Sequence, residues 1–181
     1  MYLPGGPHVS RRFARTIRRH DYALTLDRAF AEVIQACAAP RGDQHGTWLS
    51  PQMQQAYIAL HEAGFAHSAE VWRDGQLIGG IYGVALGKVF FGESMFSRQT
   101  NASKLALYWL AQQLWAWDYH LLDGQVGSDH LYNMGATDLS RPEFIKKLQI
   151  GLQFPHRQGQ WNFDLPAALN APQASRHLPQ V

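Results

Sequence analysis

The order of segments along the chain predicts a mixed α/β domain in which a largely antiparallel sheet is flanked by helices. Residues 67–73, 76–86 and 88–96 have the composition of strands, and the Asp74-Gly75 turn between the first two is typical of a hairpin. Helix-start signals lie both before and after this group of strands. Consecutive strands usually pair with their neighbours, so the helices are expected to cover the faces of the sheet.

Capping residues mark where the helices begin. Each is a Ser, Asp or Asn directly before a helix-forming run, namely Ser10, Asp27, Ser50, Asn101 and Ser140. Proline follows Ser50 at the first helical position, and Glu143 completes a capping box with Ser140. The second helix carries an apolar stripe that predicts a buried face, made of Phe30, Val33, Ile34 and Cys37. Short strands are expected at residues 22–26 and 121–126.

The composition changes after residue 152. Residues 1–152 are predicted to form one domain, whereas residues 153–181 are rich in Pro, Gln, Asn and Ala and lack sustained periodicity. This second segment is therefore expected to be an extended or partly disordered tail, with Trp161 and Phe163 as candidate anchors.

Length and composition limit the class of protein. The chain has 181 residues, of which 46% are apolar, and a net charge of +2, so binding to a polyanion requires local clustering of charge. The single cysteine, Cys37, excludes an intramolecular disulfide and a cysteine-rich zinc site. Without a signal-like start or an apolar stretch of ~20 residues, the chain is expected to be cytoplasmic.

Arginines gather in the first predicted helix, and their spacing places them along one face: Arg11, Arg12, Arg15, Arg18 and Arg19. Phe13 and Ile17 are expected to face the core on the other side. A solvated helix face is one interpretation of this pattern. Almost no acidic residue dilutes the charge, which favours a ridge that binds RNA phosphates without reading bases.

One predicted strand carries a carboxylate among apolar residues. Strand alternation places Phe91, Glu93 and Met95 on one face, so an acid and a flexible apolar side chain share a surface. Glu93 then either forms a structural ion pair, with Arg98 as the candidate partner, or takes part in function.

A second acid lies on the strand predicted at residues 121–126. Asp123 and Gln125 share one face of it, and a carboxylate can fix the direction in which a neighbouring amide points. Gln125 would then present its carbonyl oxygen to the proton of an amine. The alternative is a buried network whose polar groups satisfy one another.

Two common kinds of site are disfavoured. Gln76-Leu-Ile-Gly79-Gly80-Ile81 approximates a loop for coenzyme A pyrophosphate, but Ile81 occupies its last small position and the segment has the pattern of a strand interior. His61-Glu62 followed by His67 lacks the spacing of a zinc motif, so no metal or cofactor is predicted.

Six different short motifs follow one another along the chain: Gly46-Thr-Trp48, His67-Ser-Ala-Glu70-Val-Trp72, Gly79-Gly-Ile-Tyr-Gly83, Phe91-Gly-Glu-Ser-Met-Phe-Ser-Arg98, Asn101-Ala-Ser-Lys104 and Asp123-Gly-Gln125-Val. Together they resemble the leucyl/phenylalanyl-tRNA-protein transferases over about residues 9–152. The segment from Gly92 to Arg98 is the most specific part of this resemblance.

The resemblance implies an acetyltransferase-like fold and a reaction without a cofactor. It implies transfer of Leu or Phe from leucyl- or phenylalanyl-tRNA to proteins with N-terminal Arg or Lys, which marks them for degradation, by an enzyme expected to be monomeric. By the family pattern, Asp123 orients Gln125, Gln125 helps to take the proton of the attacking amine, and Glu93 contacts substrate.

The resemblance also assigns binding positions. The aminoacyl end of the tRNA is expected to contact Met95, Trp48, Ile81, Phe90 and Ser97, and the tRNA backbone to contact Arg11, Arg15, Arg18 and Arg19. The family's small N-terminal domain has no counterpart before the basic helix. A catalytically impaired, truncated paralogue that binds tRNA or a peptide is therefore the alternative function.

Overall fold

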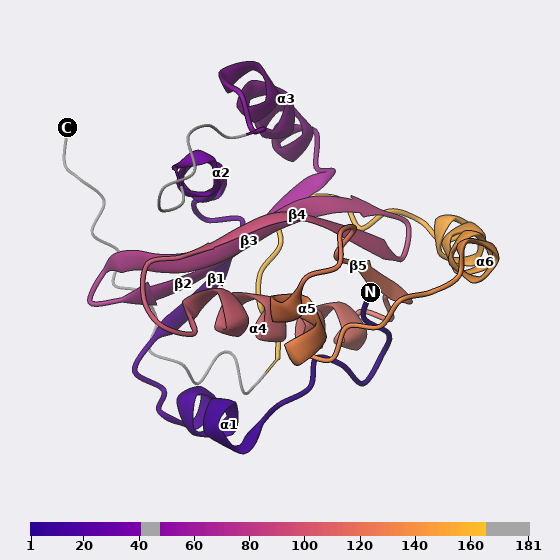
Figure 1. Ribbon diagram of the computed structural model, residues 1–181. Helices are drawn as coiled ribbons and strands as arrows, with labels where there is room; N and C mark the ends of the chain where they lie inside the picture. Colours follow the sequence, from indigo (N-terminus) through magenta and orange to yellow (C-terminus); the bar gives the residue numbers. More distant parts are fainter. Residues whose placement is uncertain (41–47, 166–181) are drawn as a thin grey trace.

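A five-stranded sheet forms the centre of the computed structural model, which describes residues 1–40 and 48–165 (Figure 1). The strands lie in the sheet in chain order: β1 (Ala23–Leu26), β2 (Ala66–Arg73), β3 (Gln76–Leu86), β4 (Val89–Ser97) and β5 (Leu121–Asp123). Strands β1 to β4 pair antiparallel, whereas β5 pairs with β4 in parallel. The predicted mixed α/β class with a largely antiparallel sheet is confirmed.

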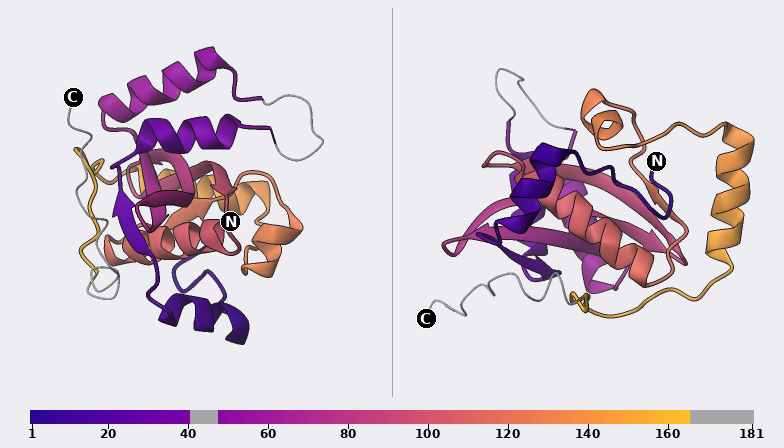
Figure 2. Two further views of the ribbon diagram at one scale, coloured as in Figure 1. Left: turned by 90° about the vertical axis from the view of Figure 1, so that its left-hand side faces the viewer. Right: turned by 90° about the horizontal axis from the view of Figure 1, so that it is seen from below.

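Helices cover both faces of this sheet (Figure 2). They are α1 (Arg11–Arg18), α2 (Phe30–Ala38), α3 (Pro51–Glu62), α4 (Ala102–Ala116), α5 (Asp129–Asn133) and α6 (Arg141–Leu152). Helices α2 and α3 lie on one face and α4 on the other, with α1 beyond α4. Within the described residues, no helix is long and apolar enough to cross a membrane.

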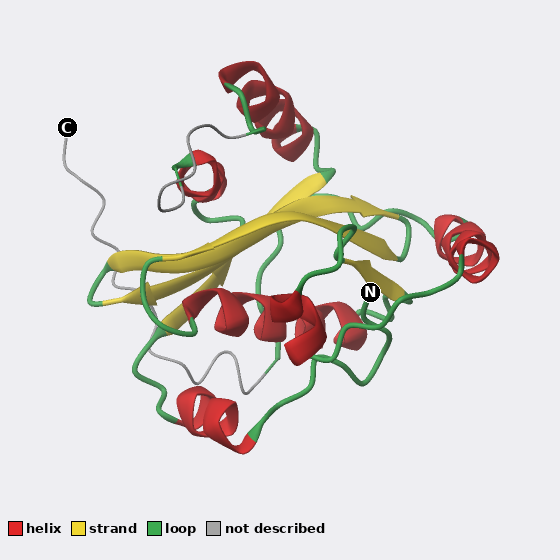
Figure 3. Ribbon diagram, in the orientation of Figure 1, coloured by secondary structure: helices red, strands yellow, loops and turns green. Residues whose placement is uncertain are grey.

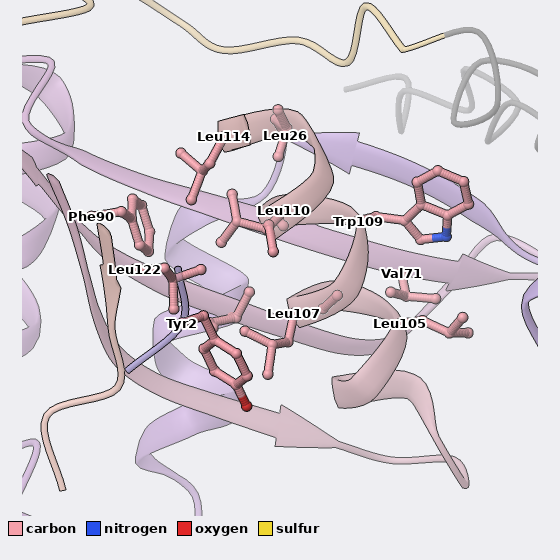
Figure 4. Packing of buried hydrophobic residues seen from close by; sticks show 14 of the residues in the cluster. Tyr2, Leu26, Val71, Phe90, Leu105, Leu107, Trp109, Leu110, Leu114 and Leu122 are labelled. Carbon is pink, nitrogen blue, oxygen red and sulfur yellow. The ribbon is translucent and has the colours of Figure 1, made fainter. Parts of the chain in front are cut away.

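The larger hydrophobic cluster lies between α4 and the sheet. Leu110 and Leu114 of α4 are fully buried there, together with Val71 and Phe90 of the sheet (Figure 4). On the other face, α2 buries its apolar stripe, and Cys37 is only 4% exposed. The predicted core face of the second helix is thus confirmed.

Side-chain caps begin α1, α3 and α6, three of the helices drawn in red in Figure 3, as the sequence predicts. Ser10, Ser50 and Ser140 each accept a hydrogen bond from the backbone N–H three residues further on. Glu143 completes the capping box of α6. These caps are interactions within one turn, which is why the sequence alone locates them.

The predicted cap at Asp27 is wrong. Ala29 occupies that position of α2, and it makes no side-chain capping bond. Asp27 is buried instead, where its carboxylate accepts hydrogen bonds from the backbone N–H groups of Ser68 and Trp161, over 2.9 and 2.8 Å. Its Oδ2 also lies 2.7 Å from Nδ1 of His67. Asp27 therefore joins β2 to the segment that contains Trp161 rather than starting a helix.

Asn101 does occupy the N-cap position of α4, but its side chain makes no capping bond. Its amide donates instead to the Thr16 hydroxyl of α1, over 3.3 Å. The predicted strand at residues 121–126 is also shorter than expected, because β5 ends at Asp123.

Residues 153–165 contain no helix or strand, yet part of this segment packs against the domain. Trp161 is 1% exposed and stacks on His67, with the ring centroids 3.6 Å apart. Phe163 is partly buried against the larger hydrophobic cluster, to which Trp161 belongs. Asp164 accepts hydrogen bonds from Gln113 and Trp117. The two anchors are confirmed, whereas the domain boundary at residue 152 stays a prediction and residues 166–181 lie outside the described part.

Candidate active site

A cleft of about 1170 Å³ opens beyond the end of β5, where the longer strand β4 continues. Strand β5 pairs with β4 only at residues 89–91 and ends at Asp123, while β4 continues to Ser97. Residues 93–98 form one wall of the cleft, and the segment that follows β5 forms another, with Gln125, His130 and Leu131 among its lining side chains. The end of α2 and Trp48 complete it.

A smaller cavity of about 70 Å³ adjoins the cleft and is largely apolar. It shares with the cleft the residues Glu93, Ser94, Met95, Gly124 and Leu131. Its other lining residues are Tyr2, Ile81, Gly92, Leu107 and Leu122. The wider cleft, lined by polar and apolar side chains, is therefore continuous with a smaller and largely apolar cavity.

A β-bulge in β4 places Glu93. The register between β3 and β4 shifts so that Gly83 faces Gly92 and Tyr82 faces Ser94, which leaves Glu93 as the extra residue. A Cβ atom at Gly83 would lie 2.1 Å from a carbonyl oxygen of β4, so the bulge requires glycine there. The sequence shows the glycine but not the slip in register.

The bulge changes which side chains share a face. Phe91 pairs with Val84, which packs on the cluster under α2 and α3, whereas Met95 pairs with Ile81, which belongs to the cluster under α4. The predicted common face of Phe91, Glu93 and Met95 is therefore wrong, because alternation restarts after the inserted residue. Met95 and Glu93 still meet, at the junction of the cleft and the small cavity.

The partner of Glu93 comes from α3. The hydroxyl of Tyr57 hydrogen-bonds to the carboxylate; burial raises the pKa of Tyr57, and the bond to Glu93 raises it further. Arg98, the partner considered from the sequence, donates to the Leu77 carbonyl over 2.9 Å. The ion pairs found among the described residues do not join Arg98 to Glu93.

Asp123 and Gln125 do not share a strand face, which corrects the prediction. Gln125 follows the end of β5 and adopts a left-handed conformation with φ of 58°. The Asp123 carboxylate accepts a hydrogen bond from the backbone N–H of Gln125 over 2.9 Å, and the Gln125 amide donates to the Gly92 carbonyl over 3.3 Å. Oε1 of Gln125 accepts no hydrogen bond from the described residues, so it remains available to a donor in the cleft.

The other candidate binding residues are dispersed. Trp48 lines the cleft with 58% of its surface exposed, and it contacts Tyr57 edge-on at 6.5 Å between ring centroids. The hydroxyl of Ser97 accepts from the backbone N–H of Ser103 over 3.2 Å. Phe90 is fully buried in the core and is not among the residues that line either cavity.

The basic ridge of α1 lies near the start of α4. Its five arginines are exposed, and Phe13 is buried while Ile17 packs partly buried against the core, as predicted. The bond from Asn101 to Thr16 holds α1 against the N-terminal end of α4, where Ser103 lines the cleft. The helix that carries the ridge is therefore joined to the end of α4 that borders the cleft.

The sequence profile of the leucyl/phenylalanyl-tRNA protein transferase family matches residues 2–149. The chain belongs to this family. It is 55% identical over 165 residues to the leucyl/phenylalanyl-tRNA–protein transferase of Alkalilimnicola ehrlichii, which covers 91% of this chain and 64% of that protein. Identity to the transferase of Cellvibrio japonicus is 54% over 146 residues, with 81% and 62% covered. The chain thus spans less than two thirds of the length of these relatives.

A solved structure also resembles this member of the leucyl/phenylalanyl-tRNA protein transferase family. It is a ribosomal-protein-alanine N-acetyltransferase from Brucella melitensis biovar Abortus 2308, with 20% identity and a TM-score of 0.42, covering 65% of this chain and 95% of that one. A superposition of this extent adds nothing to the family assignment.

Sequence reasoning missed several side chains of the site in this family member. Leu107 and Leu122 belong to apolar patterns, but nothing local distinguishes them from other core residues. His130 lines the cleft; burial lowers its pKa, as does the charge of Lys104, and its Nε2 has no hydrogen-bond partner. In the described ranges, no group of three or more His, Cys, Asp or Glu side chains is placed to hold a metal ion.

Proposed function

We propose that the chain transfers Leu or Phe from aminoacyl-tRNA to the N-terminal α-amino group of proteins that begin with Arg or Lys, in the cytoplasm. The observation that carries this proposal is one cleft that joins a free amide oxygen, Oε1 of Gln125, to an apolar cavity beside Glu93. An amine and an apolar side chain are the two features that such a cleft has to accommodate at once.

The chemistry needs little more than placement. An aminoacyl ester is already activated, so holding the amine against its carbonyl carbon supplies much of the acceleration. Gln125 Oε1 accepts a hydrogen bond from the attacking amine, the new N–C bond forms as the ester C–O bond breaks, and the proton passes to the leaving ribose oxygen. Ile81, Met95 and Leu107 surround the Leu or Phe side chain in the small cavity.

The acceptor and the tRNA use the remaining groups. Glu93 is the carboxylate within the cleft that suits a cationic acceptor terminus. The exposed arginines of α1 bind the phosphate backbone, since guanidinium groups pair with phosphates irrespective of base sequence.

The test is transfer of labelled Phe from phenylalanyl-tRNA to a peptide that begins with Arg. We expect transfer by the wild type, loss of roughly 10² or more in Gln125→Ala, and no change in Gln52→Ala, an exposed glutamine of α3. A peptide with an acetylated N-terminus should accept nothing. Binding of the charged tRNA without transfer at any enzyme concentration would contradict the proposal and indicate a binding module.

A further inference from the structure

One wall of the small apolar cavity comes from neither the sheet nor α4. Tyr2 lies ahead of all helices and strands in the chain, yet its side chain is 1% exposed and lines the cavity. Figure 4 shows its ring beside Leu107 and Leu122, which line the same cavity.

Three hydrogen bonds fix this ring in place. The backbone N–H of Tyr2 donates to the Leu122 carbonyl over 2.8 Å, and the Leu122 N–H donates to the Tyr2 carbonyl over 3.1 Å. The hydroxyl donates to the buried carbonyl of Leu131 over 3.0 Å. The two backbone bonds fix the main chain of Tyr2 beside β5, so its ring can leave the cavity only by breaking the hydroxyl bond to α5.

The same bonds give the wall its chemical character. A phenol can donate one hydrogen bond, and Tyr2 donates it to the carbonyl oxygen of Leu131. The Tyr2 hydroxyl therefore has no hydrogen bond left to donate to a bound ligand. Burial raises the pKa of Tyr2, which keeps the phenol neutral. Toward the cavity, Tyr2 is therefore a rigid apolar surface.

We propose that Tyr2 is a specificity-determining residue whose ring limits the size of the amino-acid side chain that the cavity accepts. The inference rests on the proposed function, because it takes the cavity to be the donor amino-acid pocket. A close-packed wall discriminates by size: one methylene group in an apolar pocket changes selectivity by roughly 10- to 200-fold.

Two substitutions, one that makes the side chain at position 2 smaller and one that makes it larger, test this inference. In Tyr2→Leu the cavity gains room, and we expect the ratio of kcat/KM for phenylalanyl-tRNA over leucyl-tRNA to rise by roughly tenfold; in Tyr2→Trp it should fall by a similar factor. Tyr2→Phe keeps the ring and should leave the ratio within about twofold of wild type. A purely structural role would lower both rates together and leave the ratio unchanged in all three variants.

A binding measurement separates this inference from the proposed function. Adenosine that carries Leu or Phe through a stable amide is titrated against wild type and each variant, with folding checked by circular dichroism. Opposite shifts in the ratio of the two dissociation constants support the pocket wall even if the wild type transfers nothing. Equal ratios in Tyr2→Leu and Tyr2→Trp would overturn it, and if one of these fails to fold, the other against Tyr2→Phe decides.

Discussion

The carboxylate of Asp123 accepts a hydrogen bond from the backbone N–H of Gln125 over 2.9 Å. This bond closes the turn after β5 and holds Gln125 in its left-handed conformation. Asp123 therefore fixes the position of the whole residue, while the Gly92 carbonyl, 3.3 Å from Nε2, fixes the direction of the side-chain amide.

Replacing Asp123 tests the role of the hydrogen bond. In Asp123→Ala the turn loses its acceptor, so we expect kcat for transfer to fall by roughly 10² with little change in the affinity for tRNA. Asp123→Asn keeps an acceptor oxygen and should retain most of the activity. Single-turnover transfer and filter binding measure the two quantities. Equal losses in both variants would show that the negative charge matters instead.

Gln125→Gly should be more stable than the wild type but inactive in transfer. A left-handed conformation costs a residue with a side chain roughly 1–2 kcal/mol, a cost that glycine does not have. We expect a higher midpoint of thermal unfolding together with loss of transfer. Asp118→Gly is the matched control, because Asp118 is exposed, has φ of 60° and lies outside the cleft; it should stabilise without affecting transfer.

Glu70 should make stability depend on pH. It is fully buried, Thr25 and Ser68 donate to its carboxylate, and burial raises its pKa from 4.5 to about 8. Between these values the unfolded chain is ionised while the folded protein keeps the proton, so the free energy of unfolding falls as pH rises from about 4.5 to about 8.

Glu70→Gln removes this titration. Urea unfolding at pH 5 and at pH 8 should show a smaller loss of stability with rising pH in Glu70→Gln than in the wild type. Glu62→Gln, which changes an exposed acid of α3, should behave like the wild type. An unchanged slope in Glu70→Gln would mean that Glu70 is ionised in the folded protein.

Binding of tRNA should depend on salt through the basic ridge. Each phosphate contact contributes about 0.7–0.9 to the slope of log K against log salt concentration. The double variant Arg15→Ala, Arg18→Ala should therefore bind tRNA more weakly at low salt and reduce that slope by roughly 1–2. Arg141→Ala, an exposed arginine at the start of α6, should leave the slope unchanged. Equal slopes would place the tRNA elsewhere.

The segment after α6 should contribute to the stability of the domain. Trp161 is buried against His67, so Trp161→Ala should lower the free energy of unfolding by about 3–5 kcal/mol, and Trp161→Phe by less. Leu152→Ala, at a half-exposed position, should have a small effect. Denaturant unfolding of each variant measures the difference. If Trp161→Ala is neutral, the domain ends at residue 152 as the sequence predicts.

Local patterns were reliable where the interactions are local. Ser10, Ser50 and Ser140 bond within their own helical turn, and these caps lie where the sequence predicts them. Asp27 has the same local appearance, but its carboxylate bonds to the backbone of Trp161, 134 residues away. Nothing in the neighbouring sequence distinguishes a capping Asp from one that is held by a distant segment.

The sequence by itself determined the order of helices and strands, the family and the exposed arginine ridge, because periodicity, caps and motifs depend on residues close together in the chain. Only the tertiary structure decided that the bulge separates Met95 from the face of Phe91, and that Tyr2 bonds to Leu131 across 129 residues to wall the apolar cavity. Strand register and contacts between distant segments follow from how the whole chain packs, and no local pattern encodes them.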